Sequence, residues 1–185
     1  LSHAALEADV RTIAEQEALW LVTENKKAGE RNGAKMVQLA QANAVAVVKL
    51  QAESNRPGAD TRPAEDFYQL RSQVHLAIGA PVMLIANMIW DTRTVQAGLM
   101  NGARGTVIAI VTTRPMPSLP DYVIVDFPDY KGAAFWHDHP TWVPVPPIAR
   151  QSKSAPQFER TQLPLRLAWA LTVHKAQGLT CPEGI

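Results

Sequence analysis

The most informative stretch of the chain reads Leu163-Pro-Leu-Arg-Leu-Ala-Trp-Ala-Leu-Thr-Val-His-Lys-Ala-Gln-Gly-Leu-Thr180. Large apolar side chains at positions 165, 167, 169 and 171 alternate with Arg166 and two alanines, a period that is typical of a strand. This pattern predicts a strand that feeds a turn or short helix beginning near Thr172. The polar residues after the apolar run are Thr172, His174, Lys175, Gln177 and Gly178.

This polar group has the chemistry of an anion site. A helix that begins near Thr172 offers a hydroxyl and free backbone N–H groups, and the helix dipole favours negative charge there. His174 and Lys175 add donors, and Gly178 can supply the left-handed conformation that ends a short helix. The run therefore indicates a ligand rich in phosphate, while the plainer alternative is a solvated helical face.

The same run resembles motif V of the superfamily 1B DNA helicases, the RecD-like group, and most closely the PIF-type helicases. Their version reads roughly Ala-Trp-Ala-x-Thr-x-His-Lys-x-Gln-Gly-x-Thr, and every one of those positions matches here. Upstream, Gly79-Ala-Pro-Val-Met-Leu-Ile-Ala-Asn87 and Gly98-Leu-Met-Asn-Gly-Ala-Arg-Gly-Thr-Val107 resemble two further family patterns in the family's order. These patterns read Gly-Ala-x-Val-Met-Leu-x-x-Asn and Gly-Leu-x-Asn-Gly-x-x-Gly-x-Val.

The composition of the chain limits the class of protein to which it can belong. The chain has 185 residues, of which 46% are hydrophobic, and this suffices for a buried core and argues against a disordered or fibrous protein. Its 18 basic and 17 acidic residues give a net charge of +1, so nucleic-acid binding requires local clusters of charge. The single cysteine cannot form an internal disulfide, and no apolar run reaches the ~20 residues that span a bilayer. We expect a soluble internal piece of a longer protein.

The first third of the sequence has α/β character. Leu6, Val10 and Ile13 recur at helical spacing, which predicts an amphipathic helix before Trp20. Residues 19–22 then form a short apolar run that predicts a buried strand. A helix is expected from Thr23 or Asn25 to about residue 41, with an apolar face of Met36, Val37, Leu39 and Ala40. A second strand over residues 44–50 completes a strand-helix-strand unit, which is typical of an α/β layer. Residues 54–64 are rich in turn formers and predict a loop.

The middle of the chain is β-rich. Ten of the 14 prolines lie between Pro115 and Pro164, which excludes long helices there. Short β-rich runs occur at residues 82–85, 106–111, 122–127 and 142–145, and Asn101-Gly102 is a strong turn signal. We therefore predict a small β-barrel inserted into an α/β domain.

The resemblance implies the same layout. In PIF-type helicases the second RecA-like domain is interrupted by an SH3-like β module, after which the chain returns to the RecA-like sheet for motif V. The expected boundaries are residues 1–71 for the first part of the RecA-like domain, 72–160 for the SH3-like insertion, and 161–185 for the truncated return.

The resemblance also assigns roles to residues. It implies that Thr172, His174 and Lys175 contact the DNA backbone, and that Gln177 and Gly178 lie near the phosphates of the nucleotide. Phosphate contacts set position without reading bases, so sequence-tolerant and salt-sensitive binding is expected.

The β module holds further candidates. Asn101, Gly102 and Gly105 are predicted to be structural turn residues. Arg104 could reach a DNA phosphate or could simply be solvated, and the tryptophans at 90, 136 and 142 could stack on bases or belong to the core. The sequence His137-Asp-His139 has no further ligands at usual metal-site spacings, so no metal site is predicted.

Two motif classes are missing. The chain has no Gly-x-x-x-x-Gly-Lys-[Ser/Thr] phosphate loop and no acidic pair at a strand end to hold Mg²⁺. In the family both belong to the first RecA-like domain, which would bind most of the ATP and Mg²⁺. The arginine-bearing motif VI is also absent, so this piece alone is expected to be inactive as an ATPase.

The resemblance thus implies part of an ATP-dependent 5′-to-3′ DNA helicase that unwinds duplex DNA by translocating on single-stranded DNA in repair, recombination or telomere maintenance. Expected partners are single-stranded DNA, DNA junctions and ATP, with no membrane, in a monomeric intracellular protein of the nucleus or mitochondrion if the source is eukaryotic. The alternatives are the helicase lobe of a transposon replication protein or conjugative relaxase, and a non-catalytic nucleic-acid-binding module. The upstream sequence would separate an enzyme from such a module.

Overall fold

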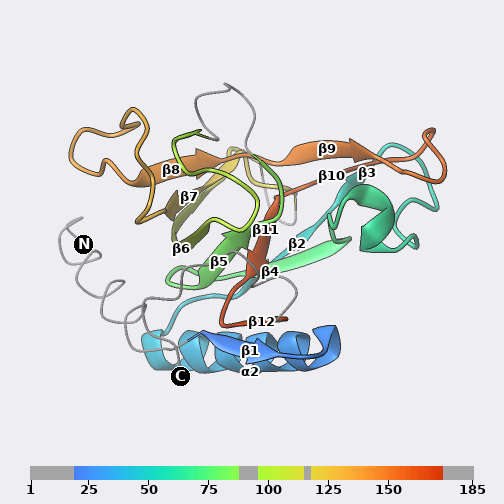
Figure 1. Cartoon of the computed structure of the whole chain (residues 1–185). Coiled ribbons are helices and arrows are strands. Elements are labelled where there is room, and N and C mark those ends of the chain that lie inside the picture. The colour runs from blue at the N-terminus through green and yellow to red at the C-terminus, as the bar shows by residue number, and fades with distance from the viewer. Residues whose placement is uncertain (1–18, 88–95, 115–117, 173–185) are drawn as a thin grey trace.

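The computed structural model describes residues 19–87, 96–114 and 118–172. Helix α2 lies along one end of the molecule, with β1 and β12 beside it and the remaining strands stacked above (Figure 1). In chain order the elements are β1 (Trp20–Val22), α2 (Asn25–Asn43), β2 (Val48–Gln51), β3 (Glu53–Ser54), the 3₁₀ helix η1 (Ala64–Phe67), β4 (Gln73–Leu76), β5 (Pro81–Leu84), β6 (Arg104–Val111), β7 (Tyr122–Asp126), β8 (Trp142–Val145), β9 (Ile148–Gln151), β10 (Glu159–Gln162), β11 (Leu165–Leu167) and β12 (Ala170–Thr172).

The largest sheet has five antiparallel strands in the order β11-β5-β6-β7-β8. Alternating residues of these strands, such as Val123 and Val125 of β7, point into the main hydrophobic core. The pairing of β6 with β7 shifts register between Val107 and Ala109, which marks a bulge. The four β-rich runs predicted for this region are confirmed as β5, β6, β7 and β8.

Helix α2 packs on the small parallel sheet formed by β1 and β12 (Figure 1). The predicted helix is confirmed, and it ends at Asn43, where Ala44 turns left-handed with a φ of 51°. Its buried stripe consists of Ala28, Asn32, Met36 and Leu39. Val37, which the sequence places on this face, is instead 53% exposed because it lies one residue off the stripe.

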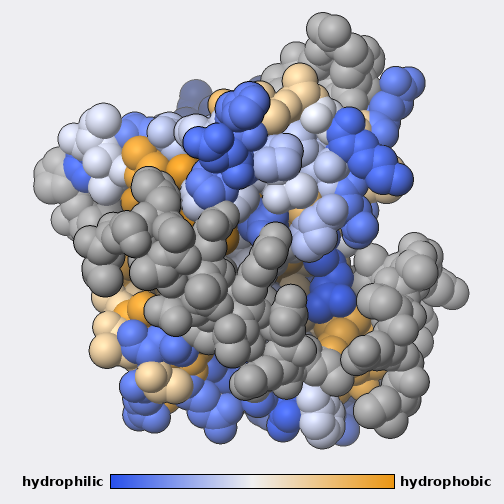
Figure 2. Space-filling view, turned by 90° about the vertical axis from the view of Figure 1, so that its left-hand side faces the viewer, coloured by the Kyte–Doolittle hydropathy of each residue, from blue (hydrophilic) through white to orange (hydrophobic). Residues whose placement is uncertain are grey.

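Strand β1 confirms the predicted strand but not its burial. Trp20 is 52% exposed and Leu21 is 48% exposed, because only β12 pairs with this strand in the described part of the chain. The Arg31 guanidinium lies 3.8 Å from the centre of the Trp20 ring and covers part of it. Figure 2 shows hydrophilic side chains gathered at the top and along the bottom of one face, with apolar patches between them.

The strand after α2 belongs to a different sheet from the one predicted. β2 pairs antiparallel with β4, not with β1, and this register buries Leu50 and Leu76 in the main core. The predicted strand-helix-strand layer is therefore wrong in its second strand. The β2–β4 pair also joins residues on both sides of the predicted boundary between 71 and 72.

The apolar run over residues 163–172 forms two strands, not the single strand predicted. β11 pairs with β5 in the large sheet, and β12 pairs with β1. Between them, Ala168 N donates to Pro81 O and Trp20 N donates to Trp169 O, so the chain changes sheets at residues 168–169. Trp169, only 7% exposed, packs with Met36 and Leu39 of α2 in the core.

A fourth sheet, of three strands, has the order β3-β10-β9 and lies beside η1 at the opposite end of the molecule from α2 (Figure 1). The described chain is thus α/β, with one α-helix and several sheets. Among the described residues, no helix is both long and apolar enough to cross a membrane.

Candidate nucleic-acid interface

Thr172 is the last described residue of the predicted phosphate-binding run. It ends β12 opposite Val22 of β1, and its side chain is 5% exposed. Because β1 and β12 are parallel, both end at the same edge of their sheet, and α2 begins at Asn25 just beyond that edge. Ligands of open α/β sheets bind at such an edge. The other predicted residues of this run, His174, Lys175, Gln177 and Gly178, lie outside the described residues.

An asparagine of α2 holds β12 in place. The Asn32 amide nitrogen donates to Ala170 O at 2.9 Å, and Ala170 N donates to the Asn32 side-chain oxygen at 2.8 Å. Asn32 is 7% exposed, so both polar groups are satisfied away from water. This clamp fixes the strand two residues before Thr172. The contact of Asn32 with β12 was not predicted from the sequence, although a lone amide on the buried stripe of a helix was the available signal.

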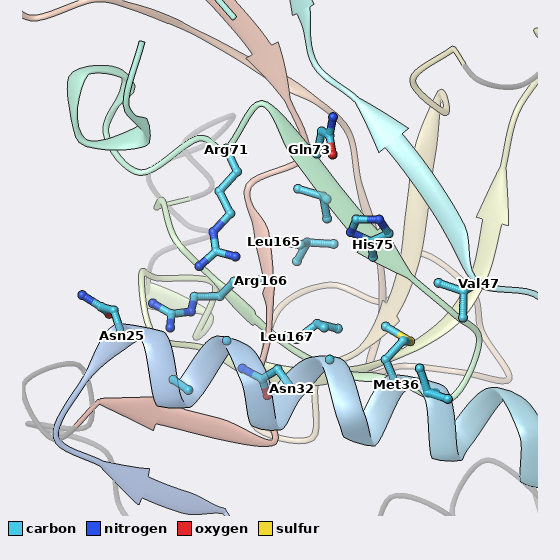
Figure 3. Close-up of a pocket in the computed structure, with 15 residues that line it drawn as sticks. Asn25, Asn32, Met36, Val47, Arg71, Gln73, His75, Leu165, Arg166 and Leu167 are labelled. Carbon is cyan, nitrogen blue, oxygen red and sulfur yellow. The ribbon is translucent and has the colours of Figure 1, made fainter. Parts of the chain in front are cut away.

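A cavity of about 440 Å³ lies between α2 and strands β4 and β11 (Figure 3). We call it the α2–β4–β11 cavity. Figure 3 shows Arg71, Arg166 and Asn25 gathered toward one end and Met36 and Val47 toward the other. The remaining lining residues are mostly apolar or small: Ala28, Gly29, Asn32, Gly33, Val37, Gln73, Val74, His75, Leu165 and Leu167.

The two arginines of this cavity have no acidic partner in the described part of the chain. Among the described residues neither Arg71 nor Arg166 makes an ion pair, and no aspartate or glutamate lines the cavity. Burial lowers the pKa of Arg166 below its ordinary value, and the positive charge of Arg71 lowers it further. A partly desolvated cation beside a second cation is unfavourable unless an anion joins them.

A third arginine, Arg104, lies on the same face of the five-stranded sheet as Arg166. Arg166 of β11 and Arg104 of β6 are both direct Cα partners of Met83, which lies between them on β5. Directly opposed residues share one face of a sheet, so the two arginines lie on the same face. Arg104 is half-buried there, and its contact with DNA stays a prediction. Arg71 and Arg166 were not singled out from the sequence, because their proximity depends on the pairing of distant strands.

The chain is similar in sequence to known DNA helicases. Residues 70–110, which include β4, β5 and most of β6, match the family model described as "DNA helicase Pif1, 2B domain". The chain is 32% identical over 108 residues to the human ATP-dependent DNA helicase PIF1 and 37% identical over 111 residues to that of Danio rerio. Each match covers 58% of this chain and 14% of the relative. The resemblance to the PIF-type helicases is confirmed.

Solved structures of Pif1 helicases have a similar fold. The structure of the Candida albicans Pif1 helicase matches 97% of this chain with a TM-score of 0.62 at 20% identity, and the match covers 42% of that structure. The structure of a Bacteroides Pif1 helicase in complex with ADP-AlF3 and single-stranded DNA matches 99% of this chain with a TM-score of 0.58 at 17% identity, and covers 38% of that structure. The chain therefore spans less than half of each of these two structures.

The segment that resembles the Pif1 2B domain contains the predicted turn residues. Asn101 and Gly102 do form a turn, in which Gly102 has a φ of 101° and the Asn87 side chain accepts a 2.8 Å hydrogen bond from Asn101 N. Gly105 lies in β6 and not in a turn. A Cβ there would collide with the Asp126 carbonyl and the Val125 side chain of β7, so close strand packing is the reason for this glycine.

The remaining candidates of the β module are on its surface or in its core. Trp142 is 7% exposed and packs with Ile108, which favours the core interpretation, and Trp136 is half-buried beside them. His139 stacks on Trp142 with ring centres 3.7 Å apart, while His137 lies beside Asp138. Within the described ranges, no three histidine, cysteine or acidic side chains form a metal-binding group. Trp90 lies outside those ranges.

Proposed function

We propose that this chain is the part of a Pif1-type, ATP-dependent 5′-to-3′ DNA helicase that contains the second RecA-like domain and its SH3-like insertion. One observation carries the proposal. The chain leaves the β-rich sheet at β11, enters the parallel pair β1–β12, is clamped there by Asn32, and leads directly into the Thr-x-His-Lys-x-Gln-Gly run. This path connects a 2B-like module to a segment with the chemistry of a phosphate site.

The strand pairings support shifted limits for the insertion. β2 and β4 pair with each other, β3 pairs with β10, and β11 pairs with β5, whereas among the described elements the α/β unit consists of α2, β1 and β12. We therefore place the insertion at about residues 48–167, in place of the expected 72–160. The SH3-like barrel would be built from the five-stranded sheet together with β2 and β4, whose side chains share its core.

Different residues of the chain would contact the DNA and the nucleotide. Thr172, His174 and Lys175 would hold the phosphates of single-stranded DNA, and Gln177 and Gly178 would face the nucleotide. The described residues supply neither a phosphate loop nor a candidate Mg²⁺ group, so no step of ATP hydrolysis is assigned to them. ATP and Mg²⁺ would be bound by another domain of the protein. Binding to DNA junctions, a monomeric state and a nuclear or mitochondrial location remain predictions from the family resemblance.

Replacing Lys175 with alanine in the full-length protein tests the proposal. If Lys175 contacts a phosphate, its loss should weaken single-stranded DNA binding for all sequences and lower the slope of log affinity against log salt by about 1. Fluorescence anisotropy with a labelled oligonucleotide at several salt concentrations measures both effects. Lys131→Ala removes an equal charge from the exposed surface of the β module and is the matched control. Wild-type affinity and unwinding in Lys175→Ala would refute the assignment.

A further inference from the structure

We propose that the α2–β4–β11 cavity binds one nucleotide unit of single-stranded DNA, with its phosphate between Arg71 and Arg166 and its base toward Met36 and Val47. The inference rests on the proposed function and adds to it a second contact site, separate from the Thr172–Gly178 run. The family patterns found in the sequence specify none of these four residues, and none is a predicted DNA contact, although Arg71 lies within residues 70–110 that match the Pif1 2B model.

The cationic end of the cavity is suited to a phosphate. The side chains of Arg71 and Arg166 extend toward the same region (Figure 3), where their positive charges repel each other and no described acidic group separates them. An anion between them would turn this repulsion into two attractions. Guanidinium groups bind phosphate oxygens with paired hydrogen bonds, so arginines suit such a site better than the single ammonium group of a lysine would.

The first turn of α2 adds to the attraction at this end. Asn25, Ala28 and Gly29 line the cavity, so the positive end of the helix dipole lies beside the two arginines. The N-cap residue Glu24 makes no side-chain capping bond, and the first turn contains no acidic residue. The first backbone N–H groups of α2 therefore have no side-chain acceptor of the usual capping kind.

Two glycines keep the wall of the cavity open. Gly29 and Gly33 lie one helical turn apart, and a Cβ at either position would meet no atom within 4 Å. Nothing in the packing of α2 requires a glycine at these positions, although glycine weakens a helix relative to alanine. A planar ligand that approaches the helix backbone would explain both glycines, since the methyl groups of alanines at these positions would narrow the cavity.

A nucleotide unit fits the size and polarity of the cavity. Its volume of about 440 Å³ is in the range of small-molecule sites, which are mostly apolar with a few placed polar groups. Polarity changes along its length, from the arginine end to an apolar end at Met36 and Val47 (Figure 3). A phosphate joined to a flat base has the same distribution of polarity. Because the phosphate makes the charged contacts, binding should tolerate any DNA sequence.

Substitutions in the full-length protein test the site, with a fluorescein-labelled oligothymidylate as the probe. Arg71→Gln and Arg166→Gln should each weaken binding by about tenfold and lower the salt slope by about 1. Gly29→Ala with Gly33→Ala should also weaken binding, while the thermal midpoint is unchanged or raised. This combination separates a ligand site from a structural role. Arg56→Gln removes the same charge from an exposed position outside the cavity and should change neither the affinity nor the salt slope.

The outcomes separate this inference from the proposed function. If the protein binds oligothymidylate and hydrolyses ATP but the cavity variants bind like the wild type, the cavity assignment fails and the helicase assignment stands. If the wild type neither binds the oligonucleotide nor hydrolyses ATP, both fail. If a peptide of alternating glutamate and leucine binds the cavity more tightly than the oligonucleotide does, and Arg166→Gln abolishes that binding, the site belongs to a protein partner and the inference is wrong.

Discussion

Arg160 and Arg166 lie on consecutive strands, β10 and β11, yet their surroundings differ completely. Arg160 is 0% exposed, and its guanidinium donates to Leu70 O at 2.8 Å, Ala59 O at 2.5 Å and Arg62 O at 2.9 Å. It also lies 4.1 Å from the centre of the Phe67 ring, and only its Nε lacks a hydrogen-bond partner. Arg166 lines an open cavity and faces a second arginine.

Electrostatics follow the same contrast. Burial lowers the pKa of both guanidinium groups. At Arg160 the negative charges of Asp60 and Asp66 oppose that effect, whereas at Arg166 the charge of Arg71 adds to it. A buried cation whose donors find acceptors holds a fold together, and one left beside another cation indicates a ligand. The difference distinguishes a structural arginine from a binding one.

The same substitution at the two positions gives the largest expected effect. Arg160→Met takes the guanidinium donor away from the Leu70, Ala59 and Arg62 carbonyl groups, of which Ala59 O keeps a 3.3 Å bond from Arg62 N. The free energy of local opening of the 55–71 loop should therefore fall by about 3 kcal/mol. Hydrogen exchange measured on peptides from this loop in the full-length protein reports that quantity. Exchange at the wild-type rate would show that Arg160 does not anchor the loop. The distinction between a structural Arg160 and a binding Arg166 would then be wrong.

Arg166→Met should have a smaller effect on local stability. Removing a partly desolvated charge that faces Arg71 relieves repulsion, so local stability should stay within about 1 kcal/mol of the wild type or rise. Hydrogen exchange of peptides from β4 and β11 measures it. A loss as large as that of Arg160→Met would mean that Arg166 is also structural, and its role in the cavity would have to be abandoned.

The smallest effect concerns the loop that Arg160 anchors, and it depends on pH. Hydrogen bonds from Ser152 and Ser154, and then from Arg62, lower the pKa of Asp66 from its ordinary 3.8 to about 2. The ionised carboxylate therefore stabilises the fold fully above pH 3.8, and this contribution is lost as the pH falls toward 2. Asp66→Asn should have a lower thermal midpoint than the wild type at pH 7, and the difference should shrink as the pH falls from 3.8 through 2 and vanish below that.

A matched variant separates this effect from a general change of charge. Glu65→Gln removes a carboxylate from the neighbouring, exposed position and should leave the midpoint nearly unchanged at every pH. If the difference between the wild type and Asp66→Asn stays constant from pH 7 to pH 2, the hydrogen bonds to Asp66 do not stabilise the loop in the ionised state.

Local patterns in the sequence were sufficient for much of the fold. The helix over residues 25–43 follows from its apolar spacing, and the strands of the five-stranded sheet follow from their alternation, because side-chain periodicity reports directly on local backbone geometry. The Asn101-Gly102 turn and the resemblance to the PIF-type helicases were also readable, since both depend on residues close together in the chain. The same information identified Thr172 and the four polar residues that follow it as candidates for the site, which remain predictions.

Only the tertiary structure decided which segments meet. No local pattern reveals that β12 pairs with β1 from the opposite end of the chain, that β2 pairs with β4 instead of β1, or that Gly105 is needed because β7 passes so close. The roles of Arg160, Arg166 and Arg71 depend on the same long-range pairings. The physical reason is that the energetic consequence of a buried charge is set by the atoms around it, and strands distant in sequence supply those atoms.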